Sequence, residues 1–257
     1  MLKHSLKHLF VLFRQQLLKF RLLFVSTIDF NNHSTILIIA PHPDDEIFGC
    51  GGFLPEYLSR GGVAYVVYLT DGENSLSDLQ PVVVGRERIK INERVLDMLD
   101  IRNDRRYYLN LADGKLPRKG ENGFIEVVDS LKRLLKDIKP DAVFVTDKNE
   151  TWPFDHVAAF EMADEAIKDS DIGTSLYSYW VWVWYSMPIK KFRGIDWRHT
   201  YRIPIHAGIQ KKKEFINAYL QPLAPDGRPW CGVLPDALLK AFDYPYEIVT
   251  KITAGRD

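Results

Sequence analysis

Short apolar runs alternate with segments of helical periodicity over residues 35–168. Residues 35–40 (TILIIA) and 63–70 (VAYVVYLT) are almost continuously apolar, as is typical of strands buried on both faces of a sheet. Shorter strands are predicted at residues 107–109 and 142–146. Helical spacing predicts helices between the strands, at residues 45–60, 85–100, 124–138 and 156–167. This alternation predicts an α/β fold with a mostly parallel, Rossmann-like sheet and helices on both faces.

The chain is less regular after residue 170. Residues 177–185 (YSYWVWVWY) alternate tryptophan with tyrosine or valine, which predicts a strand whose aromatic side chains are buried rather than stacked against sugars. A helix is predicted at residues 209–219 and a last strand at 246–252. No repeat, low-complexity segment or linker interrupts the chain, so we expect residues 31–257 to form a single domain.

The first 30 residues carry an apolar stripe beside basic side chains, and no acid precedes Asp29. The stripe has helical spacing and comprises Leu6, Phe10, Phe13, Leu17, Phe20 and Phe24; the basic residues are Lys3, Lys7, Arg14, Lys19 and Arg21. These charges make the segment a poor membrane span, and it lacks the small-residue cleavage site of a signal peptide. Two interpretations stay open for residues 5–25. One is an amphipathic helix with an exposed stripe that lies on an anionic membrane, and the other is a helix packed on its own domain or on a second subunit.

The overall composition is that of an ordinary globular protein, with 46% hydrophobic and 26% charged residues. The 34 basic and 34 acidic residues balance, which does not favour nucleic acid as a partner. Cys50 and Cys231 are too few for a disulfide framework or a thiolate zinc cluster, and they fit a reducing, cytoplasmic compartment. Any bound metal is therefore expected to be held by His, Asp or Glu.

Polar side chains follow the predicted strands, where an open α/β sheet binds its ligands. His42, Asp44 and Asp45 come directly after the first strand. Two adjacent carboxylates and an imidazole are costly to bury unless something neutralises them, and a zinc ion would do so. One carboxylate can bind the metal while the other faces a metal-bound water. His156, at the expected start of a helix, is the best candidate for the third ligand.

The same residues resemble the opening motif of the PIG-L/LmbE-like zinc-dependent N-deacetylases. The motif runs from Ile38 to Glu46 (IIAPHPDDE) and continues in Gly49-Cys50-Gly51-Gly52. Shorter matches follow in order at Thr70-Asp71-Gly72-Glu73, Asp113-Gly114, Pro140-Asp141 and Asp155-His156-Val157-Ala158-Ala159. The resemblance spans residues 35–168 and implies an α/β fold, a zinc cofactor and hydrolysis of N-acyl bonds on GlcNAc-type substrates.

Carried over position by position, the resemblance implies a role for six residues. His42, Asp45 and His156 match the zinc ligands, and Asp44 matches the general base. Arg88 matches a substrate-contacting arginine, with Arg86 as a close competitor, and Asp113 matches an aspartate that positions the sugar or orders the pocket.

The chain also departs from the family pattern at two positions. Pro153 stands where the family commonly has a histidine that stabilises the oxyanion, and Ile91 stands where it has a glutamate. Loss of one oxyanion donor can cost about a hundredfold in rate. Candidate replacements are His199, His206 and Lys148.

These features predict a zinc-dependent hydrolase that removes an N-acetyl group from an amino sugar or a GlcNAc-containing glycoconjugate. The expected partners are that substrate and, through residues 5–25, the cytoplasmic face of a membrane. Two alternatives stay open: an amidase of thiol-cofactor metabolism, and a catalytically weakened family member that binds metal or glycan.

Overall fold

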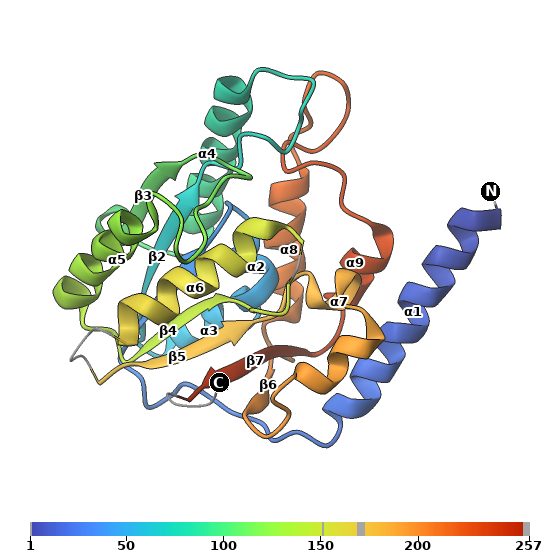
Figure 1. Ribbon diagram of the computed structural model, residues 1–257, viewed down its shortest axis with the longest axis horizontal. Coiled ribbons are helices and arrows are strands. Elements are labelled where there is room, and N and C mark those ends of the chain that lie inside the picture. Colours follow the sequence, from blue (N-terminus) through green and yellow to red (C-terminus); the bar gives the residue numbers. More distant parts are fainter. Residues whose placement is uncertain (1, 151, 169–172, 254–257) are drawn as a thin grey trace.

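The computed structural model describes residues 2–150, 152–168 and 173–253 (Figure 1). Within these residues the strands form one seven-stranded sheet in the order β3-β2-β1-β4-β5-β7-β6. The strands are β1 (Thr35–Ala40), β2 (Val63–Thr70), β3 (Arg106–Leu111), β4 (Ala142–Thr146), β5 (Ser175–Tyr179), β6 (Thr200–Pro204) and β7 (Tyr246–Ile252). The first five run parallel, whereas β7 is antiparallel to both β5 and β6. The predicted α/β fold with a mostly parallel sheet is confirmed.

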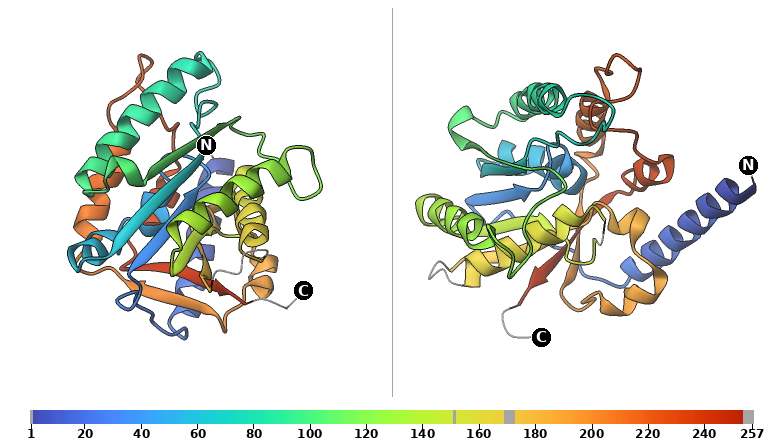
Figure 2. Two further views of the ribbon diagram at one scale, coloured as in Figure 1. Left: turned by 90° about the vertical axis from the view of Figure 1, so that its left-hand side faces the viewer. Right: turned by 45° about the horizontal axis from the view of Figure 1, so that its top comes forward.

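Helices cover both faces of the sheet, as the alternation in the sequence predicts (Figures 1 and 2). The helices are α1 (Leu2–Leu22), α2 (Asp45–Cys50), α3 (Leu54–Ser59), α4 (Pro81–Met98), α5 (Phe124–Ile138), α6 (Phe154–Lys168), α7 (Val183–Ser186), α8 (Ile209–Leu220) and α9 (Asp236–Ala241). Successive side chains of a strand point to opposite faces. In β1, Leu37 and Ile39 therefore pack with α5 and α6, while Ile36 and Ile38 join the core that α2, α3, α4 and α8 cover.

The prediction of a strand at residues 177–185 is wrong beyond Tyr179. β5 ends there, and α7 begins at Val183. The backbone N–H groups of Val181 and Val183 donate to the buried carboxylate of Glu150, so they are not available for a neighbouring strand. The tryptophans of this segment are buried, as expected. β6, α7 and α9 were not predicted, and the helix expected at residues 45–60 is divided into α2 and α3.

Helix α1 packs along α7 and α9, and its N-terminal end projects from the margin of the molecule (Figure 1; right view of Figure 2). Leu18 and Leu22 are fully buried and belong to the main core. Gln15 Nε2 donates to the carbonyl oxygens of Trp184 and Ala237 at 3.2 and 2.7 Å. The segment after the helix continues along the edge of β6, where the Ile28 N–H donates to the Arg202 carbonyl. The helix is thereby fixed to the domain by its polar and aliphatic face.

The predicted apolar stripe lies on the opposite, outward face of α1, with Phe24 in the turn that follows the helix. Phe10, Phe13, Phe20 and Phe24 are 54, 56, 61 and 72% exposed, and Leu17 is half-buried. The side chain of Leu6 lies outside the described part of the chain. None of the helices in that part is long and apolar enough to cross a membrane.

Candidate active site

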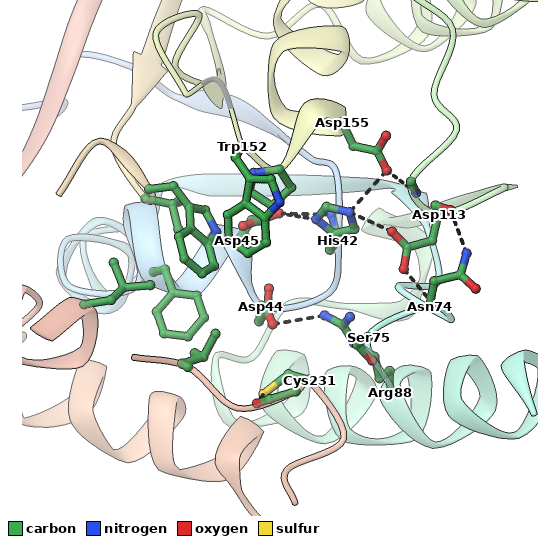
Figure 3. A pocket seen from close by; sticks show the side chains of 18 of the residues that line it. His42, Asp44, Asp45, Asn74, Ser75, Arg88, Asp113, Trp152, Asp155 and Cys231 are labelled. Atoms are coloured by element: carbon green, nitrogen blue, oxygen red, sulfur yellow. Dashed lines mark hydrogen bonds and ion pairs between the residues drawn. The ribbon is translucent and has the colours of Figure 1, made fainter. Parts of the chain in front are cut away.

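A cavity of about 420 Å³ lies at the carboxyl ends of the parallel strands (Figure 3). Its walls come from the loops after β1, β2, β3 and β4, and from two segments of the second half of the chain, at Val181–Trp182 and residues 231–238. The site thus occupies the position that the open α/β rule assigns to a ligand.

The structure brings the three predicted metal ligands together. His42 Nδ1 lies 3.2 Å from Asp45 Oδ2, and His156 Nε2 lies 3.3 Å from Asp45 Oδ1. One ligand atom from each of the three residues falls within 4.8 Å of the others. Asp45 opens α2 directly after β1, and His156 sits in the first turn of α6 after β4. Neighbouring parallel strands therefore bring residues 111 positions apart to one point, as His156 and Asp45 show.

Two observations show that this group fits a divalent metal ion. His156 Nε2 is buried and has no hydrogen-bond partner, which leaves its lone pair or proton unsatisfied without an ion. The surrounding carboxylates also favour positive charge. Burial lowers the pKa of His156, but Asp45 and Glu150 outweigh this effect and raise it to about 9. Two imidazoles and one carboxylate are donors that a divalent metal ion accepts.

Asp44 lies beside the three candidate metal ligands and faces the cavity (Figure 3). Its backbone has a φ of 126°, a conformation that a non-glycine residue rarely adopts. The buried Glu46 carboxylate supports it by accepting the Asp44 N–H at 3.0 Å, and Tyr219 in α8 donates to the same carboxylate. Burial raises the pKa of Asp44 to about 7, although the Arg88 guanidinium opposes the rise.

Arg88 is buried in α4, and its guanidinium donates hydrogen bonds to the loop that carries Asp44 and to the loop after β2. Nη2 donates to Asp44 Oδ2 at 3.0 Å and to the Pro43 carbonyl, and Nη1 donates to the Gly72 carbonyl. A Cβ atom on Gly72 would lie 2.1 Å from the guanidinium, so the Thr70-Asp71-Gly72 motif leaves room for this side chain. Arg88 lines the cavity, whereas Arg86 is exposed on α4. Of the two competing arginines, only Arg88 therefore lies at the site.

His42 uses its second ring nitrogen on two further carboxylates. Nε2 lies 3.0 Å from Asp113 Oδ1 and 3.3 Å from Asp155 Oδ2. Asp113 also accepts the Asn74 N–H, and Asp155 accepts the N–H groups of Gly114 and Leu116. The predicted site residue Asp113 thus contacts His42, a candidate metal ligand, and also lines the cavity. Asp155 also contacts His42 Nε2, and the sequence motif did not predict this contact.

Glu150 is a further buried residue that the sequence did not indicate. It lies in the loop between β4 and α6, and its Oε2 is 2.5 Å from His156 Nδ1. Its other oxygen accepts the Val181 and Val183 N–H groups. A lone glutamate six residues before a histidine carries no recognisable pattern, so only the folded loop shows this contact.

The family of the chain follows from comparison with known proteins. Residues 37–167 match the family model described as PIG-L: GlcNAc-PI de-N-acetylase. The chain belongs to this family. The matched region runs from β1 to α6 and holds the three metal-ligand candidates, Asp44, Arg88 and Asp113.

The individual proteins that resemble this chain share less than a third of its residues in the matched regions. The chain is 29% identical over 155 residues to a 1D-myo-inositol 2-acetamido-2-deoxy-alpha-D-glucopyranoside deacetylase of Nocardia farcinica, and the match covers 52% of this chain. The chain thus spans about half the length, 51%, of that curated relative. The fold resembles N,N'-diacetylchitobiose deacetylase of Pyrococcus horikoshii in complex with its inhibitor MPG, with a TM-score of 0.61, 22% identity and coverage of 85% of this chain and 78% of that one.

The fold alone does not determine the reaction. The 4-carboxy-2-hydroxymuconate hydratase GalB of Pseudomonas putida KT2440 is equally similar in fold, with a TM-score of 0.62, 14% identity and coverage of 87% of this chain and 98% of that one. The reaction of this protein therefore depends on the side chains at its own site and not on its fold.

Pro153 remains a departure from the PIG-L family pattern. It lines the cavity, but His199, His206 and Lys148 do not. The structure therefore does not place any of these three candidate replacements at the site. His199 instead pairs with Asp196, and His206 is exposed beside Tyr246.

An apolar wall lines a further part of the cavity, and in Figure 3 its Trp152 lies away from Arg88 and Asp113. It consists of Phe48, Trp152, Phe154, Val181, Trp182, Val233, Leu234 and Leu238. Trp152 and Trp182 meet edge to face, and Trp152 remains half-exposed. The cavity thus combines charged side chains with an aromatic wall that can contact an apolar part of a ligand.

Proposed function

We propose that this protein is a zinc-dependent N-deacetylase that hydrolyses the acetamide of an amino sugar or a GlcNAc-containing glycoconjugate. The convergence of His42, Asp45 and His156 on one point, with Asp44 beside them and a cavity in front, carries the proposal. The Nocardia farcinica and Pyrococcus horikoshii deacetylases bear names of N-acetylated sugar substrates, which supports this substrate class. The retained base and ligands favour an active enzyme over a weakened binding protein.

Zinc is the metal that this donor set favours, because two imidazoles and one carboxylate with an open position are typical of hydrolytic zinc sites. His42, Asp45 and His156 would hold the ion. When bound, zinc would polarise the amide carbonyl and lower the pKa of a coordinated water.

The residues of the chain supply proton transfer and orientation. Asp44 would accept the proton of the attacking water and return it to the leaving amine. Its buried position keeps its pKa close to neutrality, and Arg88 holds the carboxylate in place through a 3.0 Å hydrogen bond. Asp113 fixes the His42 ring and contributes to the polar floor on which a sugar hydroxyl can bind.

We also propose that the outward face of α1 contacts an anionic membrane surface. Phe10, Phe13, Phe20 and Phe24 expose their rings there, and no acid lies in the helix. Burial of these rings at the lipid boundary would supply most of the binding energy. The net positive charge of the helix would add attraction to anionic headgroups, although Lys19 and Arg21 lie over the rings of Tyr244 and Trp197.

The attachment of α1 relates this surface to the cavity. Gln15 ties the helix to Trp184 and to Ala237, and the neighbouring Trp182 and Leu238 line the cavity. A membrane-bound α1 would therefore hold the cavity near the bilayer, which favours a lipid-linked substrate.

The free thiols of Cys50 and Cys231 support a cytoplasmic location.

Release of acetate and free amine from a panel of N-acetylated sugars tests the proposed reaction. The panel should contain free GlcNAc, a water-soluble GlcNAc glycoside and a lipid-linked GlcNAc, each with the zinc-loaded protein. We expect stoichiometric acetate and amine from at least one GlcNAc conjugate, with the highest kcat/KM for the lipid-linked one. Absence of turnover on every N-acetyl sugar, from protein that holds zinc, would refute the proposed substrate class.

A further inference from the structure

The Glu150 carboxylate contacts both the metal-ligand cluster and the aromatic wall of the cavity. One oxygen meets His156 Nδ1 at 2.5 Å, and the other accepts the N–H groups of Val181 and Val183 at 2.5 and 3.1 Å. Glu150 and His156 are both fully buried. Because solvent cannot compete for these contacts, the carboxylate controls the orientation of both neighbours.

The contact determines which ring nitrogen of His156 carries a proton. A carboxylate accepts hydrogen bonds, so Nδ1 must be the N–H that faces Glu150. In the neutral ring Nε2 then has the free lone pair, and this atom is the one that lies 3.3 Å from Asp45 and has no hydrogen-bond partner. A carboxylate behind a histidine ligand orients the ring and strengthens its bond to the metal.

We infer that Glu150 is a positioning residue that keeps His156 in the metal-binding tautomer and holds the aromatic wall at Val181–Trp182 against the same point. The inference rests on the proposed function, because it requires that His156 bind the metal. It adds a link between two parts of the site: the carboxylate that orients the ligand also anchors the wall that carries Trp182.

His42 offers an instructive contrast within the same site. Its Nε2 atom has two carboxylates, those of Asp113 and Asp155, within 3.3 Å. The Nδ1 atom of His156, by contrast, has the single partner Glu150 among the described side chains. Loss of Glu150 therefore leaves His156 without a substitute acceptor.

Glu150→Gln is the informative substitution, because glutamine has nearly the same shape but only one acceptor oxygen. If that oxygen stays on Val181 and Val183, the amide NH₂ faces Nδ1 and forces the ring proton onto Nε2, which then cannot bind a metal. If the amide turns over, its NH₂ meets two backbone N–H groups and leaves them unsatisfied. Both arrangements weaken the metal site.

A matched control exists in Glu247→Gln. Glu247 is also a buried carboxylate that accepts two backbone N–H groups, those of Gly52 and Phe53, and it pairs with Lys212 instead of a histidine. It does not line the cavity. This variant measures the general effect of replacing such a carboxylate.

Zinc affinity, measured by competition with a chromophoric chelator, tests the inference on the full chain. We expect Glu150→Gln to bind zinc about 10–100-fold more weakly than wild type, and Glu247→Gln to keep wild-type affinity. Equal affinity of Glu150→Gln and wild type would overturn the inference while leaving the proposed function intact. Wild-type protein that binds no zinc would instead overturn the proposed function and the inference with it.

A second measurement does not depend on the folding of the variant. A long-range ¹H–¹⁵N spectrum of the zinc-loaded wild-type protein, labelled at histidine, reports which ring nitrogen carries the proton. We expect the His156 signals of an Nδ1–H ring with Nε2 bound to metal. A proton on Nε2 of His156 would overturn the inference.

Discussion

At the residue scale, the motif after β1 predicted which side chains gather at the cavity. His42, Asp44 and Asp45 fall within four consecutive residues, so a single loop places them together, and the rule for parallel sheets brings His156 to the same edge. Glu150 could not be predicted in this way. Its role depends on the path of the loop after β4 and on backbone donors about thirty residues away, as the contact with Val181 shows.

Asp44→Asn separates the proposed base from the metal ligands. The asparagine oxygen can still accept the Arg88 hydrogen bond, so we expect the variant to fold and to retain zinc. An amide cannot take the proton of water, and we expect the rate of deacetylation to fall by about 10²–10⁴-fold. Steady-state kinetics with parallel metal analysis measures both quantities.

Asp104→Asn is a suitable control for this variant, because Asp104 is exposed and pairs with Arg102, which is exposed as well. It should keep wild-type rates. If Asp44→Asn retained wild-type activity with full zinc, Asp44 would not be the base.

At the element scale, buried strands and long amphipathic helices were predictable, while short elements were not. β1, β2, β4, β7 and α5 have the predicted bounds, because continuous burial or a strong helical stripe fixes them. α7 has four residues, and a pattern this short cannot distinguish a helical turn from a strand. The buried carboxylate of Glu150 accepts hydrogen bonds from the backbone N–H groups of this segment. These groups are then not available to a neighbouring strand, so the segment does not continue β5.

Helix α1 shows that one amphipathic pattern can serve two surfaces. Its Leu18 and Leu22 complete the core, so removal of the whole helix would expose apolar side chains of the domain. Substitutions on the outward face test the proposed membrane contact without this complication. We expect wild-type protein to float with vesicles that contain anionic lipid, and added salt to reduce the floating fraction.

The triple variant Phe13→Ser, Phe20→Ser, Phe24→Ser should lose flotation and keep its fold, because all three rings are already exposed. Ile125→Ser, on the exposed side of α5, is the matched control and should float like wild type. Equal flotation of the triple variant and wild type would contradict the membrane contact. A dimer that the triple variant abolishes would assign the stripe to a second copy of the chain.

At the scale of the whole molecule, the two halves of the chain contribute different parts of the site. The region that matches the family model supplies the candidate metal ligands, Asp44 and Arg88. The second half supplies Trp182, Cys231 and Leu238 to the cavity wall. Its Tyr219 also donates a hydrogen bond to Glu46, which supports the loop that carries Asp44. Motifs therefore predicted which polar side chains of this region lie together at the cavity. The shape of the cavity depends on long-range packing of the irregular second half, for which the sequence holds no motif.

The central claim is that deacetylation depends on one metal ion held by His42, Asp45 and His156. The most direct test is a zinc titration of the metal-free protein, in which bound zinc and amine release from a GlcNAc conjugate are measured on the same samples. We predict no turnover without metal and a linear rise in rate that ends at one zinc per chain, with no binding at this site in His42→Ala. Undiminished turnover by the metal-free protein, or by His42→Ala, would contradict the account.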